Sequence, residues 1–172
     1  NSQRKMLSHY DNATLYNDSI VAQIVKRFQK QDAIVIYVPD HGEECYEENR
    51  GFICRNHSAE IDWPLAHYEF EIPFWIYCSP KYIRNHRDIY RQIRKAKDKR
   101  FMTDALPHLL LYLAGIETPT YKEEYNILSP KYDEMRPRIL KNSADYDKLR
   151  DAHLEKIKKE ESKKVKKKER RN

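Results

Sequence analysis

The sequence predicts an α/β fold with a largely parallel sheet, and three stretches support this prediction. Residues 34–38, IVIYV, form a short apolar run without the alternation of a strand that has one solvated face. Residues 72–79, IPFWIYCS, form a second run of this kind. Apolar residues recur at helical spacing before the first run, at Ile20, Val21, Ile24, Val25 and Phe28. A helix followed by a short loop and a buried strand is half of a βαβ unit, so parallel strands are expected.

The other expected elements are helices and loops. The first helix is expected to open at the N-capping Asp11 or Asn12, after a polar connector over residues 1–9. Further helices are expected over residues 81–100 and 106–114, and Gly115 ends the second of these. Residues 43–70 are expected to form a long polar loop, and loops of that length inside a domain are usually functional.

Charge is distributed unevenly along the 172 residues, which are 40% hydrophobic and 35% charged. Residues 148–172 hold 12 basic and 5 acidic residues, so the net charge of +6 is attributed to a tail. We therefore expect residues 1–142 to form the folded portion and residues 143–172 to form a basic tail that is helical or disordered. No nucleic-acid partner is expected, and an anionic membrane surface suits such a tail better. No apolar run reaches the length of a membrane span, no signal peptide is expected, and the first residue is not Met, which suggests a processed or truncated piece.

The strongest functional signal follows the first predicted strand. Pro39 ends that strand, and Asp40, His41 and Gly42 come directly after it. Ligands of open α/β sheets bind beyond the carboxyl ends of the strands, and a carboxylate beside an imidazole suits Zn²⁺. Gly42 lets the chain turn away without a Cβ in the way. A polar turn capped by Asp40 is the alternative interpretation.

A third ligand would have to return from the loop over residues 43–70. His57 is the first candidate and His67 has a similar claim, while a solvent-exposed loop histidine is the alternative for each. The same region contains Cys45 and Cys54, which could close a short disulfide or remain free thiols. The sequence leaves both choices open.

Several motifs together resemble a known family. They are Tyr10-Asp11-Asn12-Ala13, Asp40-His41-Gly42-Glu43-Glu44, the stretch from Tyr68 to Trp75, Thr103-Asp104-Ala105-Leu106-Pro107-His108, and Asn126-Ile127-Leu128-Ser129-Pro130. Over residues 10–140 this pattern resembles the sulfatase-like catalytic domain of the phosphoethanolamine transferases, which modify bacterial lipopolysaccharide. The pattern is most similar to the branch that acts on a core heptose.

The resemblance implies the C-terminal part of an alkaline-phosphatase/sulfatase-like α/β/α sandwich with Zn²⁺ as its cofactor. Asp40 and His41 would then be metal ligands. His57 would be a catalytic residue that contacts the phosphoryl group, and His67 would be a second substrate-binding histidine. Phosphatidylethanolamine would be the donor and lipopolysaccharide, at lipid A or a core sugar, the acceptor. Such enzymes sit in the inner membrane of Gram-negative bacteria through N-terminal helices, with the catalytic domain in the periplasm.

One departure from the family pattern concerns the rest of the active site. The nucleophilic Thr, a Glu ligand and the membrane helices of the family would lie upstream of residue 1, so this chain is expected to be inactive alone. A sulfatase-like hydrolase or phosphodiesterase on the same metal scaffold is the first alternative, and a non-catalytic fragment is the second.

Overall fold

The computed structural model describes residues 2–55 and 60–169, and the chain divides into two compact units. The first unit combines Asn1–Val38 with Pro73–Arg136, and the second combines Pro39–Ile72 with Pro137–Asn172. Each unit is therefore assembled from two segments that lie far apart in the sequence. Within the described residues, no helix combines the length and the apolar character needed to cross a membrane.

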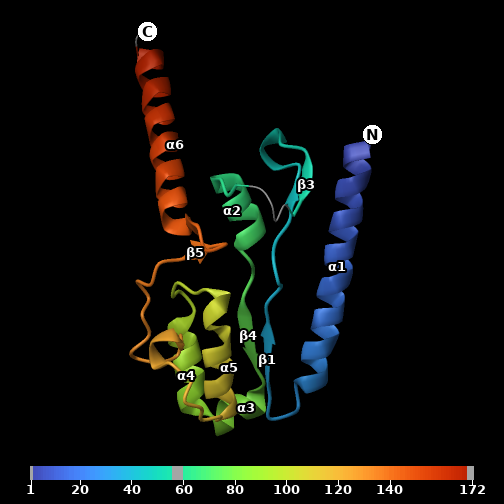
Figure 1. Ribbon diagram of the computed structural model, residues 1–172. Helices are drawn as coiled ribbons and strands as arrows, with labels where there is room; N and C mark the ends of the chain where they lie inside the picture. Colours follow the sequence, from blue (N-terminus) through green and yellow to red (C-terminus); the bar gives the residue numbers. More distant parts are fainter. Residues whose placement is uncertain (1, 56–59, 170–172) are drawn as a thin grey trace. The chain divides into compact units, whose positions relative to one another are not determined.

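A two-stranded ribbon, flanked by helices, is the centre of the first unit (Figure 1). Its elements are α1 (Ser2–Phe28), β1 (Ile34–Tyr37), β4 (Trp75–Cys78), α3 (Pro80–Asn85), α4 (Arg87–Ala96), η2 (Thr103–Ala105), α5 (Leu106–Ala114) and η3 (Glu123–Tyr125). The α/β class predicted from the sequence is confirmed. The pairing differs from the expected parallel arrangement, because β1 and β4 run antiparallel, with Ile34 opposite Cys78 and Tyr37 opposite Trp75.

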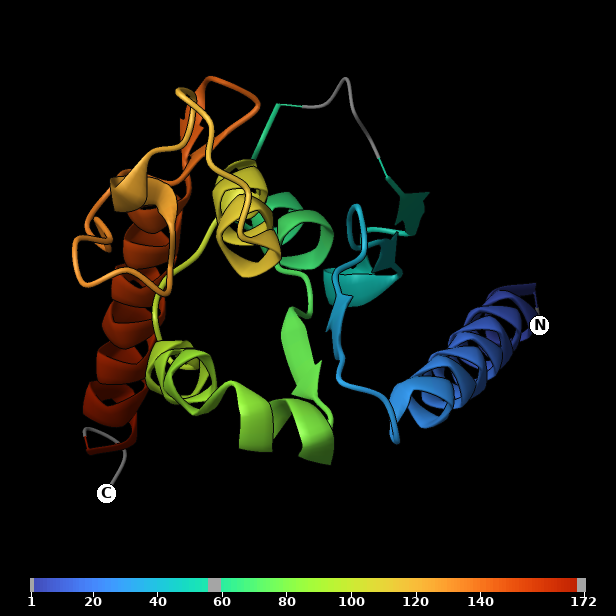
Figure 2. The ribbon, with the colours of Figure 1, turned by 90° about the horizontal axis from the view of Figure 1, so that it is seen from below.

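The antiparallel pairing follows from where the intervening chain leaves and returns. Residues 38–74 depart after Tyr37 and come back directly before Trp75, and these two residues are register partners. The chain therefore re-enters the ribbon at the end it left, which is compatible only with antiparallel strands. Figures 1 and 2 both show β1 beside β4.

Ser79 fixes the turn that follows β4. Its hydroxyl donates to the carbonyl of Gln31 at 2.5 Å and accepts the backbone N–H of Tyr82 at 3.0 Å, so it caps α3. Its own N–H bonds to the carbonyl of Ala33 at 3.0 Å. This fully buried serine thus joins the end of one strand to the start of the other.

The core of the first unit lies between α4, α5 and the segment after η3. Its buried members are Ala96, Leu109, Ile127 and Leu128, packed against Phe74, Ile76, Ile89, Ile93, Phe101, Leu106, Leu113 and Tyr132. Asp104 and Arg136 close the unit with two parallel hydrogen bonds of 2.5 and 2.7 Å. The guanidinium of Arg136 lowers the pKa of Asp104 below its ordinary value.

The second unit contains short strands and two helices. Its elements are β2 (Glu44–Cys45), η1 (Glu47–Asn49), β3 (Phe52–Cys54), α2 (Trp63–Phe70), β5 (Ile139–Leu140), β6 (Ala144–Asp145) and α6 (Tyr146–Glu169). Its buried core consists of Ala66, Leu140 and Tyr146. Because Ala66 belongs to α2 and Tyr146 begins α6, the start of α6 packs against α2 in this core.

Three expectations about helices need correction. The first helix begins at Ser2, so residues 2–9 are helical, and Asp11 and Asn12 lie inside α1. No Gly or Pro interrupts residues 2–10, and an interior Asp or Asn costs a helix less than about 1 kcal/mol, so continuation is favoured. The helix expected over residues 81–100 is two helices that meet at His86, whose φ of −126° and ψ of 50° are not helical (Figure 2). The expected loop over residues 43–70 contains α2, which is capped by Asp62.

Candidate metal centre

Asp40, His41 and Gly42 lie in the second unit, where a close backbone approach holds them in place. The N–H of Gly42 donates to the carbonyl of Glu69, at the end of α2, at 2.8 Å. A Cβ on residue 42 would lie 2.2 Å from the carbonyl oxygen of Tyr68. Only glycine fits at this distance, so Gly42 allows the segment to dock against α2.

The two predicted metal ligands converge. Oδ2 of Asp40 lies 3.4 Å from Nε2 of His41, while Oδ1 of Asp40 accepts the backbone N–H of His41 at 3.1 Å. The Asp40 side chain is 84% exposed and the His41 side chain 22% exposed, so the pair is reachable from solvent. One carboxylate oxygen is therefore engaged by the backbone while the other faces the ring.

The tautomer of His41 follows from its other ring nitrogen. Nδ1 lies 2.8 Å from the carbonyl oxygen of Gly42. A carbonyl oxygen can only accept a hydrogen bond, so Nδ1 carries the proton and a neutral ring has its lone pair on Nε2. Metal-binding histidines in proteins almost always donate their other ring N–H in this way, to a backbone carbonyl, a carboxylate or water.

The distance between Asp40 and His41 fits a single zinc ion. Zinc binds imidazole nitrogen and carboxylate oxygen at about 2.0–2.1 Å, and two such ligands at a tetrahedral angle are roughly 3.3 Å apart. The observed 3.4 Å matches this separation. Asp40 Oδ2 and His41 Nε2 can therefore fill two of the four positions around one zinc ion.

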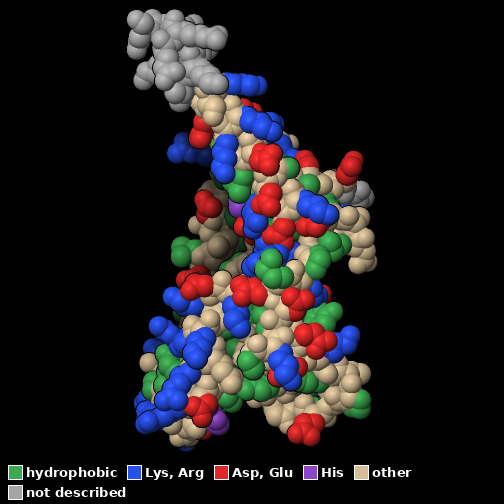
Figure 3. Space-filling view, turned by 90° about the vertical axis from the view of Figure 1, so that its left-hand side faces the viewer, with side chains coloured by type: hydrophobic (Ala, Val, Ile, Leu, Met, Phe, Trp, Pro, Cys, Tyr) green, Lys and Arg blue, Asp and Glu red, His purple; other side chains and the backbone are tan. Residues whose placement is uncertain are grey.

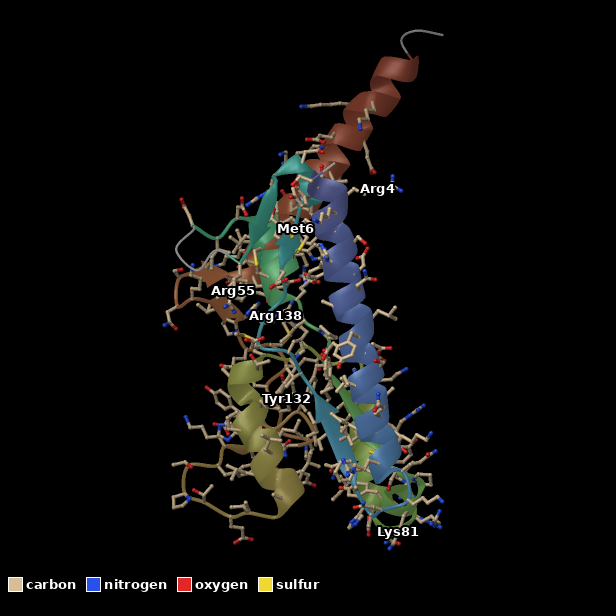
Figure 4. All side chains as sticks on the ribbon, turned by 90° about the vertical axis from the view of Figure 1, so that its right-hand side faces the viewer. Arg4, Met6, Arg55, Lys81, Tyr132 and Arg138 are labelled. Atoms are coloured by element: carbon tan, nitrogen blue, oxygen red, sulfur yellow. The ribbon has the colours of Figure 1, made fainter. Side chains whose placement is uncertain are left out.

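Arg55 was not anticipated from the sequence, and its guanidinium contacts Nε2 of His41 (Figure 4 labels Arg55). A guanidinium only donates, so this contact agrees with a lone pair on Nε2. A metal ion at Nε2 would have to displace Arg55. The exposed cation would then remain beside the site, where it suits an anionic group such as a phosphate.

An ion-pair network around the buried Glu44 supports the segment after Gly42. Glu44 is fully buried, and its carboxylate lies 2.7 Å from Nε of Arg50. The same guanidinium lies 2.5 Å from Asp62, whose other oxygen caps α2 by accepting the N–H of Leu65 at 3.0 Å. Burial raises the pKa of Glu44, and Arg50 opposes that rise. The network joins β2, η1 and the start of α2.

The other residues predicted for the site lie in different surroundings. His57 is outside the described residues. His67 lies on α2, with Nδ1 2.9 Å from Glu71 and its ring stacked on Trp63 at 5.4 Å between centroids. In residues 2–55 and 60–169, no third His, Cys, Asp or Glu joins Asp40 and His41 to form a metal-binding group. Among the described residues no disulfide joins Cys45, Cys54 or Cys78, and Cys54 lies 3.5 Å from the carboxylate of Glu43.

Comparison with known protein families gives a match over most of the chain. Residues 1–116 match the family model described as Sulfatase. Phosphoethanolamine transferase EptC of Escherichia coli O18:K1:H7 is 32% identical over 128 residues, which cover 73% of this chain and 21% of that protein. Kdo(2)-lipid A phosphoethanolamine 7''-transferase of Escherichia coli K12 is 28% identical over 58% of this chain and 17% of its own length. The chain thus spans about a fifth of the length of these curated relatives.

Solved structures give the same relationship. The C-terminal periplasmic domain of EptC from Escherichia coli superimposes with a TM-score of 0.64 at 30% identity, covering 81% of this chain and 40% of that domain. A second structure of that domain, in complex with Zn, matches with the same TM-score and identity. The segment compared therefore shares its fold with part of a larger domain.

Proposed function

The chain belongs to the sulfatase family, and from that membership we propose that it forms part of the active site of a zinc-dependent phosphoethanolamine transferase. Its relatives are named as phosphoethanolamine transferases, and one of them as acting on Kdo(2)-lipid A. The observation that carries the proposal is the 3.4 Å approach of Asp40 Oδ2 to His41 Nε2, with Nδ1 held by the Gly42 carbonyl. This arrangement presents two converging lone pairs of the kind that zinc binds.

In this proposal Asp40 and His41 hold the zinc ion. A structure of a relative in complex with Zn supports the choice of metal. When bound, the ion would lower the pKa of a nucleophilic hydroxyl and offset negative charge on the phosphoryl oxygens. The remaining ligands and the nucleophilic Thr are proposed to come from residues outside this chain, because zinc sites of this type take more than two protein ligands.

The proposed reaction has two displacement steps at phosphorus. A hydroxyl outside this chain attacks phosphatidylethanolamine, the P–O bond to diacylglycerol breaks, and the proton of the hydroxyl passes to the diacylglycerol oxygen. A hydroxyl of lipopolysaccharide, on lipid A or a core sugar, then attacks the same phosphorus. The bond from phosphorus to the enzyme oxygen breaks, and the proton of the attacking hydroxyl passes to that oxygen, which regenerates the enzyme. We propose that His57 holds the transferred proton and that His67 contacts substrate. Arg55 is close enough to His41 to neutralise phosphoryl charge once it is displaced.

The proposed location is the periplasmic face of the inner membrane of a Gram-negative bacterium. The structural relatives are described as periplasmic domains, which supports this location. Both proposed substrates are lipids of that envelope. The enzyme would therefore work at a membrane surface.

A hydrolase on the same scaffold is the second candidate, because the matching family model is described as Sulfatase. Hydrolysis would replace the lipopolysaccharide hydroxyl with water. Release of free phosphoethanolamine or sulfate, in place of a modified lipopolysaccharide, distinguishes this candidate by mass spectrometry.

The test is a metal and product analysis of the enzyme that contains this chain. We expect His41→Ala to abolish both zinc binding and phosphoethanolamine transfer, because the imidazole nitrogen proposed as a zinc ligand is removed. His9→Ala, an exposed histidine on α1, is the control and should retain both. Full zinc occupancy in His41→Ala would refute the assigned role.

A further inference from the structure

The exposed face of α4 carries a row of cations that the charge balance of the whole chain conceals. Residues 80–100 contain nine basic and two acidic residues. Four of the basic residues, Arg87, Arg91, Arg94 and Lys95, are exposed on α4 itself. The earlier attribution of the basic character to the tail alone was therefore incomplete, because acidic residues elsewhere offset this local excess.

Helix geometry places these four residues in one stripe. At 100° per residue, positions 87, 91, 94 and 95 fall within roughly 100° of one another. Ile89, Ile93 and Ala96 lie on the opposite side, where they pack into the core of the first unit. Figure 3 shows Lys and Arg side chains gathered over this helix, at the lower left of the view. We call Arg87, Arg91, Arg94 and Lys95 the basic stripe.

The basic stripe has little internal compensation. Arg91 pairs with Asp88 at 2.9 Å, an exposed contact of the kind that contributes little. Among the described residues, no carboxylate forms an ion pair with Arg87, Arg94 or Lys95. Over residues 146–162 of α6, in contrast, five acidic residues balance five basic ones, and Lys159 pairs with Glu155 at 3.5 Å. The stripe is therefore a stronger source of positive potential than this part of α6.

The shape of this surface favours an extended anionic partner. The pocket of about 560 Å³ in the first unit is lined by Gln92 of α4 and by residues 111–130, but by none of the stripe. The stripe is a straight row about 12 Å long from Arg87 to Lys95. A row of exposed charges without an enclosing pocket suits lipid head groups, which can diffuse laterally in the bilayer to meet each charge. The apolar face of α4 packs in the core of the first unit. The helix would therefore bind a bilayer by electrostatic attraction, without inserting apolar side chains into it.

We propose that the basic stripe is a docking surface for an anionic phospholipid bilayer. The proposal deepens the proposed function, on which it rests for the expectation that the substrates lie in a membrane. Docking through α4 would keep the catalytic domain close to its lipid substrates. The preceding helix, α3, also carries two exposed cations, Lys81 (labelled in Figure 4) and Arg84. They add positive charge next to the basic stripe.

The test is sedimentation of the full chain with vesicles at low salt. We expect binding to vesicles that mix phosphatidylglycerol with phosphatidylcholine, and no binding to phosphatidylcholine alone. The triple variant Arg87→Glu, Arg94→Glu, Lys95→Glu should bind at least about a hundred-fold more weakly, since each cation near such a surface contributes about five-fold. Binding should weaken between 0.01 M and 0.15 M salt, as the Debye length falls from about 30 to about 8 Å.

A matched control separates the basic stripe from net charge. Lys156→Glu, Lys158→Glu, Lys163→Glu makes the same charge change on exposed positions of α6 and should retain most of the binding. Equal loss in both variants would overturn the proposal, as would tighter binding to a DNA duplex than to the anionic vesicles at the same salt. Loss of vesicle binding on addition of millimolar inorganic phosphate, at constant ionic strength, would also contradict the proposal. A specific site for a small anion would then be responsible for the binding.

The outcome is independent of the zinc site. The vesicle assay contains no zinc and no lipopolysaccharide, so loss of metal binding in His41→Ala would leave its result unchanged. Circular dichroism of both triple variants shows whether α4 and α6 stay helical. A folded α4 variant that binds vesicles as tightly as the unmodified chain refutes the docking role and leaves the transferase proposal intact.

Discussion

At the scale of single residues, the ability of the candidate centre to bind a metal depends on the hydrogen-bond partners of its side-chain atoms. His41 is informative because its two ring nitrogens have different neighbours: the Gly42 carbonyl lies at Nδ1, and the Arg55 guanidinium and the Asp40 carboxylate lie at Nε2. Sequence could place Asp40 and His41 side by side, but it could not show the tautomer. That property is set by the backbone turn at Gly42, and the turn depends on a contact with α2 far along the chain.

Gly42→Ala tests that contact. The new Cβ would lie 2.2 Å from the carbonyl oxygen of Tyr68, so the backbone must shift and the hydrogen bond to Glu69 weakens. We expect the free energy of unfolding to fall by about 2–3 kcal/mol, measured by urea denaturation. Gly51→Ala is the comparison in the same unit, because its Cβ meets open space and only its positive φ of 92° is strained. It should cost about 1 kcal/mol, and an equal cost for the two variants would contradict the steric explanation.

Tyr146 gives a prediction about alkaline pH. Burial, together with a hydrogen bond from its hydroxyl to the carboxylate of Glu71, raises the pKa of Tyr146 to about 12. Between pH 10 and 12 the folded state therefore holds a proton that the unfolded state loses, so the free energy of unfolding decreases as pH rises through this range. The loss attributable to this residue is about 2 kcal/mol.

Tyr146→Phe should remove this part of the alkaline destabilisation, as measured by urea unfolding at a series of pH values. The control is Tyr16→Phe, which replaces an exposed tyrosine on α1 and should leave the alkaline destabilisation unchanged. An unchanged pH profile in Tyr146→Phe would mean that another group titrates in this range.

At the scale of helices and strands, short-range sequence patterns predicted the features that local sequence determines, namely where an element lies and where it ends. The apolar runs gave β1 and β4, and Gly115 ends α5 with a φ of 67°. The capped helix α2 was missed because the segment before it, residues 43–60, and Glu71 after it are strongly polar, and only six of the eight residues of α2 are apolar. Strand direction was missed for a different reason. It depends on where residues 38–74 return, and periodicity within either strand contains no information about that.

The same limit applies to the surface of α4. A helix was expected over residues 81–100, and the structure adds the break at His86, which fixes where α4 and its basic stripe begin. Net charge summed over the folded portion concealed it. Local charge on a defined helix face is therefore the more informative quantity for partner surfaces.

At the scale of the whole molecule, the chain consists of two units, each built from two separated segments. The predicted boundary at residue 142 between a catalytic portion and a tail stays a prediction, although Tyr146 and Leu149 already pack in the second unit's core. The central claim, which unites the family match with this architecture, is that the second unit presents Asp40 and His41 to one zinc ion.

Nitrogen NMR of the histidine rings tests that claim most directly. We predict that His41 is protonated at Nδ1, and that its Nε2 signal shifts when zinc is added to the enzyme that contains this chain, where the remaining ligands are present. His108, whose Nδ1 accepts the N–H of Lys122 at 3.1 Å, should show the opposite tautomer and serves as the internal control. A His41 ring protonated at Nε2, or a zinc titration that leaves its signals unmoved, would contradict the account.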